Sequence, residues 1–259
     1  MRKITLLIMA ALVSLNGIAQ NKKKERQEEK RDRINEMVRM EEEGIIAHKK
    51  SFVFGAKLTT DGYGISFELG RASSVKRAWL YQLEISERKH NKEEKIGNMY
   101  SGASPLIYGK ENFFYPVKLG LQRQVLLGNK SNKNGVSVTG NFGGGISLAL
   151  LRPYYVQVPN GNDVRYIKYN SPDSVEFMTG DIIGGPSLSK GWNDMTVTPG
   201  VYVKTGLRFD YGMFNDIVSA IEVGVNAEYY TKKIHQMVYN EQKQFFYGAY
   251  FSLLFGKRK

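Results

Sequence analysis

The chain has 259 residues, a formal net charge of +12 and no cysteine. The lack of cysteine excludes disulfides and a lipid anchor attached through a cysteine. A basic balance of this size suits nucleic acid, anionic lipid headgroups or a well-solvated surface. The export signal described next makes nucleic acid the least expected of the three, so we expect no nucleic-acid partner.

Residues 1–19 have the layout of a secretory signal peptide. Arg2 and Lys3 form a basic start, an apolar run follows from Ile4 to about Leu15, and Gly17-Ile18-Ala19 supplies small residues before a cleavage site. The apolar run is shorter than the roughly 20 residues of a membrane-spanning helix. We therefore expect the mature chain to work outside the cytoplasm.

Residues 20–50 form a charged leader. Good helix formers dominate, and pairs such as Lys24 with Glu28 are spaced four apart, as in a solvated helix. The apolar stripe is too thin to bury a core. A solvated helix and a flexible segment both remain open, and residues 21–50 are the expected contact region for other envelope proteins.

Apolar and polar residues then alternate in eight segments. These are residues 52–58, 63–70, 79–86, 113–122, 136–150, 197–209, 217–229 and 245–255. A period of two indicates strands, and the segment from Val136 to Leu150 is far longer than the roughly five or six residues of a soluble strand. Asp61-Gly62 supplies a tight hairpin turn between the first two. We expect residues 51–256 to form one antiparallel up-and-down β-barrel, followed by a basic tail at 257–259.

The connections alternate in length. Those after the third, fifth and seventh segments are longer than those after the second, fourth and sixth. Transmembrane barrels place short turns at the periplasmic end and long loops outside. With an even number of strands, both termini are expected at the periplasmic end.

The two faces of the strands differ in chemistry. One face carries Phe, Tyr, Leu, Ile and Val, whereas the other carries glycine, small hydroxyls and ionisable residues. A soluble lipocalin-like barrel would turn the apolar face inward, but glycine repeated on a solvent face would weaken such a sheet. An eight-stranded membrane barrel has a narrow lumen filled by side chains and an apolar exterior. The pattern favours the membrane barrel.

The inward face then predicts a network of charges in the lumen. Its members are Lys57, Glu68, Glu84, Lys118, Lys204, Arg208, Glu222 and Glu228. Lys204 and Arg208 are expected to neutralise Glu222 and Glu228 on the neighbouring strand. A lumen plugged in this way is favoured over a narrow pore lined by the same residues.

The signal sequence, the eight alternating strands and the final strand FFYGAYFSLLF resemble the small outer-membrane β-barrel superfamily of OmpA/OmpX-like and opacity-like proteins. The resemblance spans residues 51–256, is architectural, and brings no site residues with it. It implies an integral protein of the outer membrane, in contact with its lipid. It also implies recognition by the barrel-assembly machinery during biogenesis, through a terminal aromatic such as Phe255.

Enzymatic chemistry has little support in the sequence. Ser86 with His90, or His235 with Glu241, would be the available pairs for a lipid-modifying enzyme at the outer rim. A solvated histidine is the simpler interpretation of each. We expect no catalytic residue, no cofactor and no metal site.

The longest loop, residues 152–194, carries two sets of side chains. Its carboxylates, Asp163, Asp173, Glu176, Asp181 and Asp194, lack the spacing of a calcium-binding loop. Its aromatic residues are candidate contact residues for a protein or glycan, because they bring large rigid area. They are Tyr154, Tyr155, Tyr166, Tyr169, Phe177 and Trp192. A lid folded over the barrel mouth is an equally open interpretation.

The sequence thus predicts a non-enzymatic integral outer-membrane barrel with a structural, accessory or surface-binding role. One version of this hypothesis places the barrel in a secretion or surface-assembly complex. A narrow channel or transporter is the first alternative, and a lipid-modifying enzyme is the second.

Overall fold

The computed structural model describes residues 24–29, 31–32, 35–36, 39, 48–97, 105–129, 135–170, 172–187, 189–212 and 217–259. The chain divides into two units, residues 1–48 and 49–259. The predicted signal peptide lies outside the described residues. In the leader, residues 24–29 are helical and exposed, which favours the helical alternative for that stretch.

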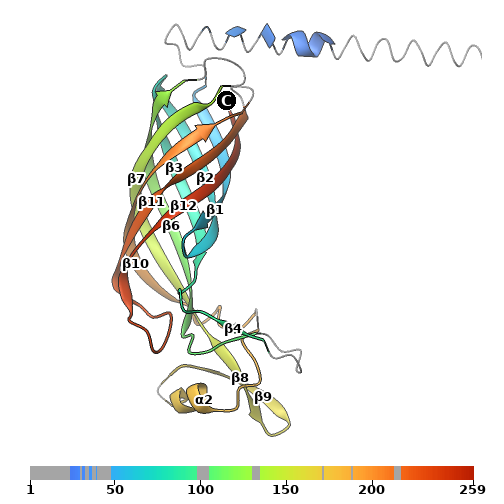
Figure 1. Cartoon of the computed structure of the whole chain (residues 1–259), viewed down its shortest axis with the longest axis vertical. Helices are drawn as coiled ribbons and strands as arrows, with labels where there is room; N and C mark the ends of the chain where they lie inside the picture. Colours follow the sequence, from blue (N-terminus) through green and yellow to red (C-terminus); the bar gives the residue numbers. More distant parts are fainter. Residues whose placement is uncertain are drawn as a thin grey trace, which may run out of the picture. The chain divides into compact units, whose positions relative to one another are not determined.

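The second unit is built on a closed ring of eight antiparallel strands (Figure 1). In chain order they are β1 (Lys50–Thr59), β2 (Gly62–Ser74), β3 (Arg77–Arg88), β6 (Asn112–Gly128), β7 (Ser137–Pro153), β10 (Thr196–Asp210), β11 (Ile217–Ile234) and β12 (Lys243–Arg258). Their order around the ring is β1-β12-β11-β10-β7-β6-β3-β2. The predicted eight-stranded, all-β barrel is confirmed, and every predicted segment overlaps one of these strands.

Closure depends on the first and last strands. β1 pairs with β12 in register from Ser51 opposite Arg258 to Thr59 opposite Tyr250. The ring therefore has no free edge, and each strand donates and accepts backbone hydrogen bonds on both sides. The chain enters and leaves the barrel at one end, called the terminal end below, where Lys50 and Lys259 bond to each other through their backbones. The opposite end is called the loop end.

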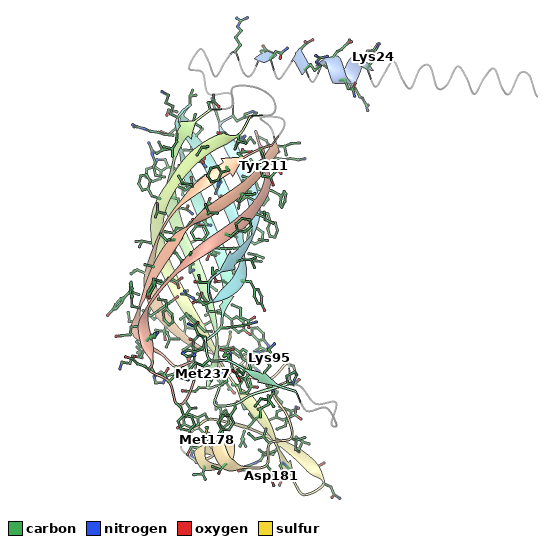
Figure 2. All side chains as sticks on the ribbon, viewed as in Figure 1. Lys24, Lys95, Met178, Asp181, Tyr211 and Met237 are labelled. Atoms are coloured by element: carbon green, nitrogen blue, oxygen red, sulfur yellow. The ribbon has the colours of Figure 1, made fainter. Side chains whose placement is uncertain are left out.

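Burial alternates along the strands as the sequence predicts, with the apolar set on the outside. Leu58 and Val203 are each 61% exposed, whereas Lys57 and Lys204 beside them in sequence are 2% and 5% exposed. Figure 2 shows side chains projecting outward from the wall of the barrel. The lipocalin-like arrangement is wrong for this chain, because its apolar residues would have to point inward. Among the described residues, no helix is long and apolar enough to cross a membrane.

Two inward glycines are required by close approach of lumen side chains. A Cβ on Gly120 would lie 2.5 Å from the Tyr202 hydroxyl oxygen, and a Cβ on Gly206 would lie 2.5 Å from that of Tyr250. A larger residue at either position would displace a tyrosine from the lumen. The glycines on the polar face therefore make room inside the barrel.

The long connections carry a small folded unit of their own at the loop end. It contains the two-stranded sheets β4 (Lys95–Ile96) with β5 (Leu106–Ile107) and β8 (Tyr155–Asn160) with β9 (Asp163–Lys168), and the helix α2 (Ser174–Thr179). Its apolar core consists of Ile107, Tyr154, Val156, Val158, Ile167, Phe177 and Met178. Residues 89–97, residues 105–111 and the described part of the longest loop thus fold together into one unit, called the loop unit below (Figure 1).

Two of the predicted contact residues belong to this core. Tyr154 is 0% exposed and Phe177 is 2% exposed, so their assignment to a contact surface is wrong. Tyr154 also accepts a hydrogen bond from the Ile107 backbone N–H at 2.8 Å. A loop with enough apolar residues to form its own core buries some of its aromatics instead of displaying them.

Candidate functional site

The first of two clusters in the lumen network is centred on Glu84 of β3. Its two carboxylate oxygens accept hydrogen bonds from the Lys57 Nζ at 2.8 Å and the Lys118 Nζ at 2.9 Å. Lys118 stands directly opposite Glu84 on the adjacent strand β6, and both residues are on the inward phase. All three side chains are buried, so each charge depends on its partners.

Glu228 of β11 joins this cluster from across the lumen. It lies 2.7 Å from the Lys118 Nζ and 3.1 Å from Nη1 of Arg88. Tyr230 donates to Glu228 at 2.7 Å. The prediction that Lys204 and Arg208 neutralise Glu228 is therefore wrong, because the cations that reach it come from β3 and β6, across the narrow interior.

A second cluster is centred on Glu222 of β11. Arg208 stands opposite it on β10 and binds it at 2.6 Å, while the Lys204 Nζ lies 3.3 Å away. The Tyr250 hydroxyl donates at 2.8 Å to Oε1 of Glu222, whereas Arg208 binds Oε2. Arg208 also binds Glu68 of β2 at 2.7 Å, so this cluster crosses the lumen too.

All eight residues of the predicted network thus lie buried inside the barrel. The structure adds charged and neutral members to it. They are Arg88, Asp61, Gln82, Gln122, Asn141, Asn226, Tyr202, Tyr230 and Tyr250. Arg88 and the polar residues on the strands occupy inward positions, so the period-two pattern could have found them. Asp61 lies in a turn, outside that pattern.

The charges of the network balance. Five cations, Lys57, Arg88, Lys118, Lys204 and Arg208, face five carboxylates, Asp61, Glu68, Glu84, Glu222 and Glu228. Tyr250 connects the two clusters, because its ring lies 4.0 Å from the Lys57 Nζ while its hydroxyl donates to Glu222. Gln82 adds a bridge within the second cluster, accepting from Lys204 at 3.1 Å and donating to Glu68 at 3.2 Å. Each of these ten charged groups lies within 3.3 Å of an opposite charge.

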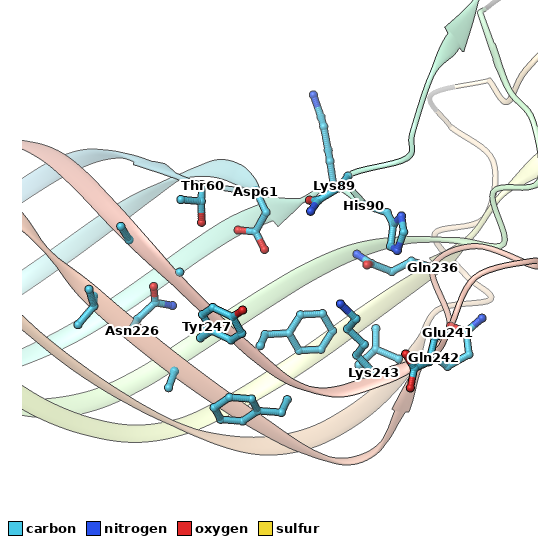
Figure 3. Close-up of a pocket in the computed structure, with 18 of the residues that line it drawn as sticks. Thr60, Asp61, Lys89, His90, Asn226, Gln236, Glu241, Gln242, Lys243 and Tyr247 are labelled. Carbon is cyan, nitrogen blue, oxygen red and sulfur yellow. The ribbon is translucent and has the colours of Figure 1, made fainter.

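A cavity of about 750 Å³ borders the network at the loop end (Figure 3). Asp61, Lys89, His90, Glu241 and Lys243 are among the residues that line it. The pKa of His90 is lowered by burial and by nearby lysines, against the opposing effect of Glu93. The neutral ring accepts a hydrogen bond at Nδ1 from the Lys92 backbone N–H at 3.2 Å. Lys204 and Asn226 of the network also line the cavity, which has both charge signs around it.

Neither of the two histidine pairs that the sequence offered for catalysis is formed. Ser86 donates to the Pro116 carbonyl at 3.4 Å, away from His90. His235 lies 3.7 Å from Glu111 and is half exposed. Three carboxylates of the longest loop, Asp173, Glu176 and Asp194, contact cations or a hydroxyl. Arg165 binds Glu176 at 2.5 Å and lies 3.8 Å from Asp173.

The other candidate contact residues lie at the surface of the loop unit or where it meets the barrel. Tyr169 is 36% exposed, Trp192 is 48% exposed, and Tyr155 and Tyr166 are half-buried. The Tyr155 hydroxyl donates to Asp194, and the pKa of Tyr155 is raised to about 12 by burial and by this bond. These four remain candidate contact residues.

Trp192 fastens the end of the longest loop to the barrel. Its ring stacks on Tyr115 of β6 at 5.9 Å, and the Arg152 guanidinium lies 4.7 Å from it and 4.3 Å from Phe113. Such ring and cation contacts contribute about 0.5–2 kcal/mol each.

Replacing Trp192 with alanine should therefore loosen the loop unit while the barrel stays folded. We expect amide hydrogen exchange in β8 and β9 to accelerate about 10-fold or more, with exchange in the barrel strands unchanged. Val175→Ala in α2, where Val175 is 73% exposed, is the matched control and should change nothing. Unaltered exchange in the tryptophan variant would show that the loop unit holds its place by other contacts.

Comparison with known proteins finds no matching family model and no matching curated protein. Among solved structures, the chain is similar to Neisserial surface protein A, with 10% identity, a TM-score of 0.37 and coverage of 81% of this chain and 96% of that chain. It is also similar to the N-terminal β-barrel domain of Pseudomonas aeruginosa OprF, with 10% identity, a TM-score of 0.36 and coverage of 81% and 98%.

The fold is a closed eight-stranded antiparallel β-barrel. The closed ring, the apolar exterior and the filled polar interior of this chain are the features of transmembrane β-barrels.

Proposed function

We propose that the protein is an integral, non-enzymatic outer-membrane barrel with a closed lumen, which displays the loop unit as a contact surface. The apolar exterior carries this proposal. Large apolar side chains exposed on all eight strands include Phe54, Leu69, Tyr81, Leu119, Phe142, Val203, Val225 and Phe251. In water such a belt would be an aggregation hazard far larger than the apolar patches of soluble monomers. In a bilayer it is the required surface.

The lumen supports a structural rather than a conducting role. An ion that moves from water into the lumen would have to break at least one buried ion pair. The interior offers no other partner for the charge that this leaves unpaired. The loop unit supports a role in surface contacts, because it is a folded body with its own core and with exposed aromatic residues such as Trp192.

Reconstitution tests both parts of the proposal. In lipid vesicles the protein should resist extraction by carbonate and should migrate differently on a gel before and after boiling, as closed barrels do. In planar bilayers it should show no discrete single-channel conductance. A protein that stays in the aqueous fraction would refute membrane insertion, whereas stepwise currents that change on neutralising Glu222 would replace the plug with a channel.

Residues 21–50 are proposed to contact other envelope proteins. The support is their composition, since a solvated, highly charged helix such as residues 24–29 buries nothing within its own segment. Photo-crosslinkers placed along this segment in intact cells should capture a defined envelope protein. Capture of lipid alone, or the same products from a scrambled leader, would count against this role.

A further inference from the structure

The surface charge of the barrel is distributed unevenly between its two ends. At the loop end, lysines and arginines are interspersed with carboxylates, as in Lys92-Glu93-Glu94-Lys95. At the terminal end the described residues include nine cations, Lys49, Lys50, Arg71, Lys76, Arg77, Arg123, Lys257, Arg258 and Lys259. Among the described residues of that end, the carboxylate is Asp210, which is buried and bound to Arg258.

Five of these cations are on the outer face of the barrel, next to the apolar residues of their strands. Lys257, Lys50, Arg71, Arg77 and Arg123 lie on the outward phase of β12, β1, β2, β3 and β6, next to outward apolar residues of the same strands. These five strands are consecutive neighbours in the ring. We call the five residues the basic arc.

The register brings the members of the arc close together. Lys50 stands opposite Arg71 on the next strand, and Arg71 stands opposite Trp79. Trp79 in turn stands opposite Arg123, whose guanidinium lies 4.7 Å from the indole ring. With strands about 4.8 Å apart, the arc follows roughly 20 Å of the barrel perimeter. The three remaining strands, β7, β10 and β11, have no outward lysine or arginine among their described residues at this end.

The place of the arc indicates which anion it meets. A cation just past the apolar belt lies at the depth of lipid headgroups, and tryptophan is enriched at that same depth. We propose that the basic arc gathers anionic phospholipids from the leaflet at the terminal end of the barrel, on one side of its perimeter. This inference rests on the proposed membrane insertion. Each lysine or arginine near an anionic surface favours it about fivefold, so several adjacent cations give a clear local enrichment.

Tryptophan fluorescence provides a local test, because the chain has two tryptophans and one of them is Trp79 in the arc. The full chain with Trp192→Phe, reconstituted in phosphatidylcholine vesicles, leaves Trp79 as the reporter. Equal small mole fractions of brominated phosphatidylglycerol or brominated phosphatidylcholine are then compared as quenchers. We expect the brominated anionic lipid to quench about fivefold more effectively than its bulk fraction predicts, and the preference to disappear in 1 M salt, where the screening length falls to about 3 Å.

A matched pair of charge variants completes the test. Neutralising Lys50, Arg71, Arg77 and Lys257 to glutamine should abolish the preference, whereas Lys92, Lys95, Lys190 and Lys232 to glutamine should leave it intact. Equal quenching by both lipids, or a preference that survives the arc variant, would overturn the proposal. No quenching by either lipid would instead refute membrane insertion itself.

Discussion

Replacing Glu84 with glutamine should destabilise the barrel by about 3–5 kcal/mol, because it leaves a buried cation without its partner. Glu84 is the shared acceptor of Lys57 and Lys118. Lys118 keeps a second partner in Glu228 at 2.7 Å, so the loss falls mainly on Lys57. Reversible denaturant unfolding in vesicles, followed by tryptophan fluorescence, measures the free energy of unfolding.

The buried location sets the size of this effect, and two further variants isolate it. Glu176→Gln removes a partner from Arg165 in a pair whose side chains are 41% and 46% exposed, and should cost less than about 1 kcal/mol. Combining Glu84→Gln with Lys57→Met should recover part of the loss, because the double variant removes the cation as well. A Glu84 variant as stable as the Glu176 variant would mean that water fills the lumen and screens its charges.

Placing an arginine on the middle of the outer face should be nearly as costly. Val225 of β11 is 55% exposed and points away from the lumen, so Val225→Arg would set a charge against the apolar belt. In a bilayer the expected cost is about 2–4 kcal/mol, as for cations near the midplane of transmembrane barrels. Unfolding in vesicles measures it.

The control for this prediction lies in the loop unit. Val175 of α2 is 73% exposed, and Val175→Arg should change the unfolding free energy by less than about 0.5 kcal/mol because water surrounds it. If both variants cost the same small amount, the exterior of the barrel faces water and the proposed membrane insertion is wrong.

The barrel itself could be predicted because its signal is local. Lys57 beside Leu58 and Lys204 beside Val203 already show which residues share a face, since successive side chains of a strand point to opposite sides. The same rule places Arg88, Gln82 and Tyr250 inside, although they were not included in the predicted network. Strand ends were less predictable, because pairing continues beyond the alternating pattern, as in β6 up to Gly128.

The loop unit could not be predicted in the same way. Residues 89–97 and 105–111 are far from the longest loop in the sequence. The shared apolar core and backbone hydrogen bonds, as when Val238 N–H donates to the Gly109 carbonyl, bring the segments together. The sequence therefore predicts that Tyr154 and Phe177 are exposed loop aromatics, whereas the structure shows both in the core of the loop unit.

The strand count, the inward and outward faces, and eight of the ten charges of the lumen network follow from the amino-acid order alone, because a period of two depends only on neighbouring residues. The pairing of these charges depends on the three-dimensional closure of the sheet. Strand order assigns neighbours, but the pairs that cross the lumen, such as Arg88 with Glu228 and Arg208 with Glu68, depend on how eight strands curve into a ring narrow enough for opposite walls to touch.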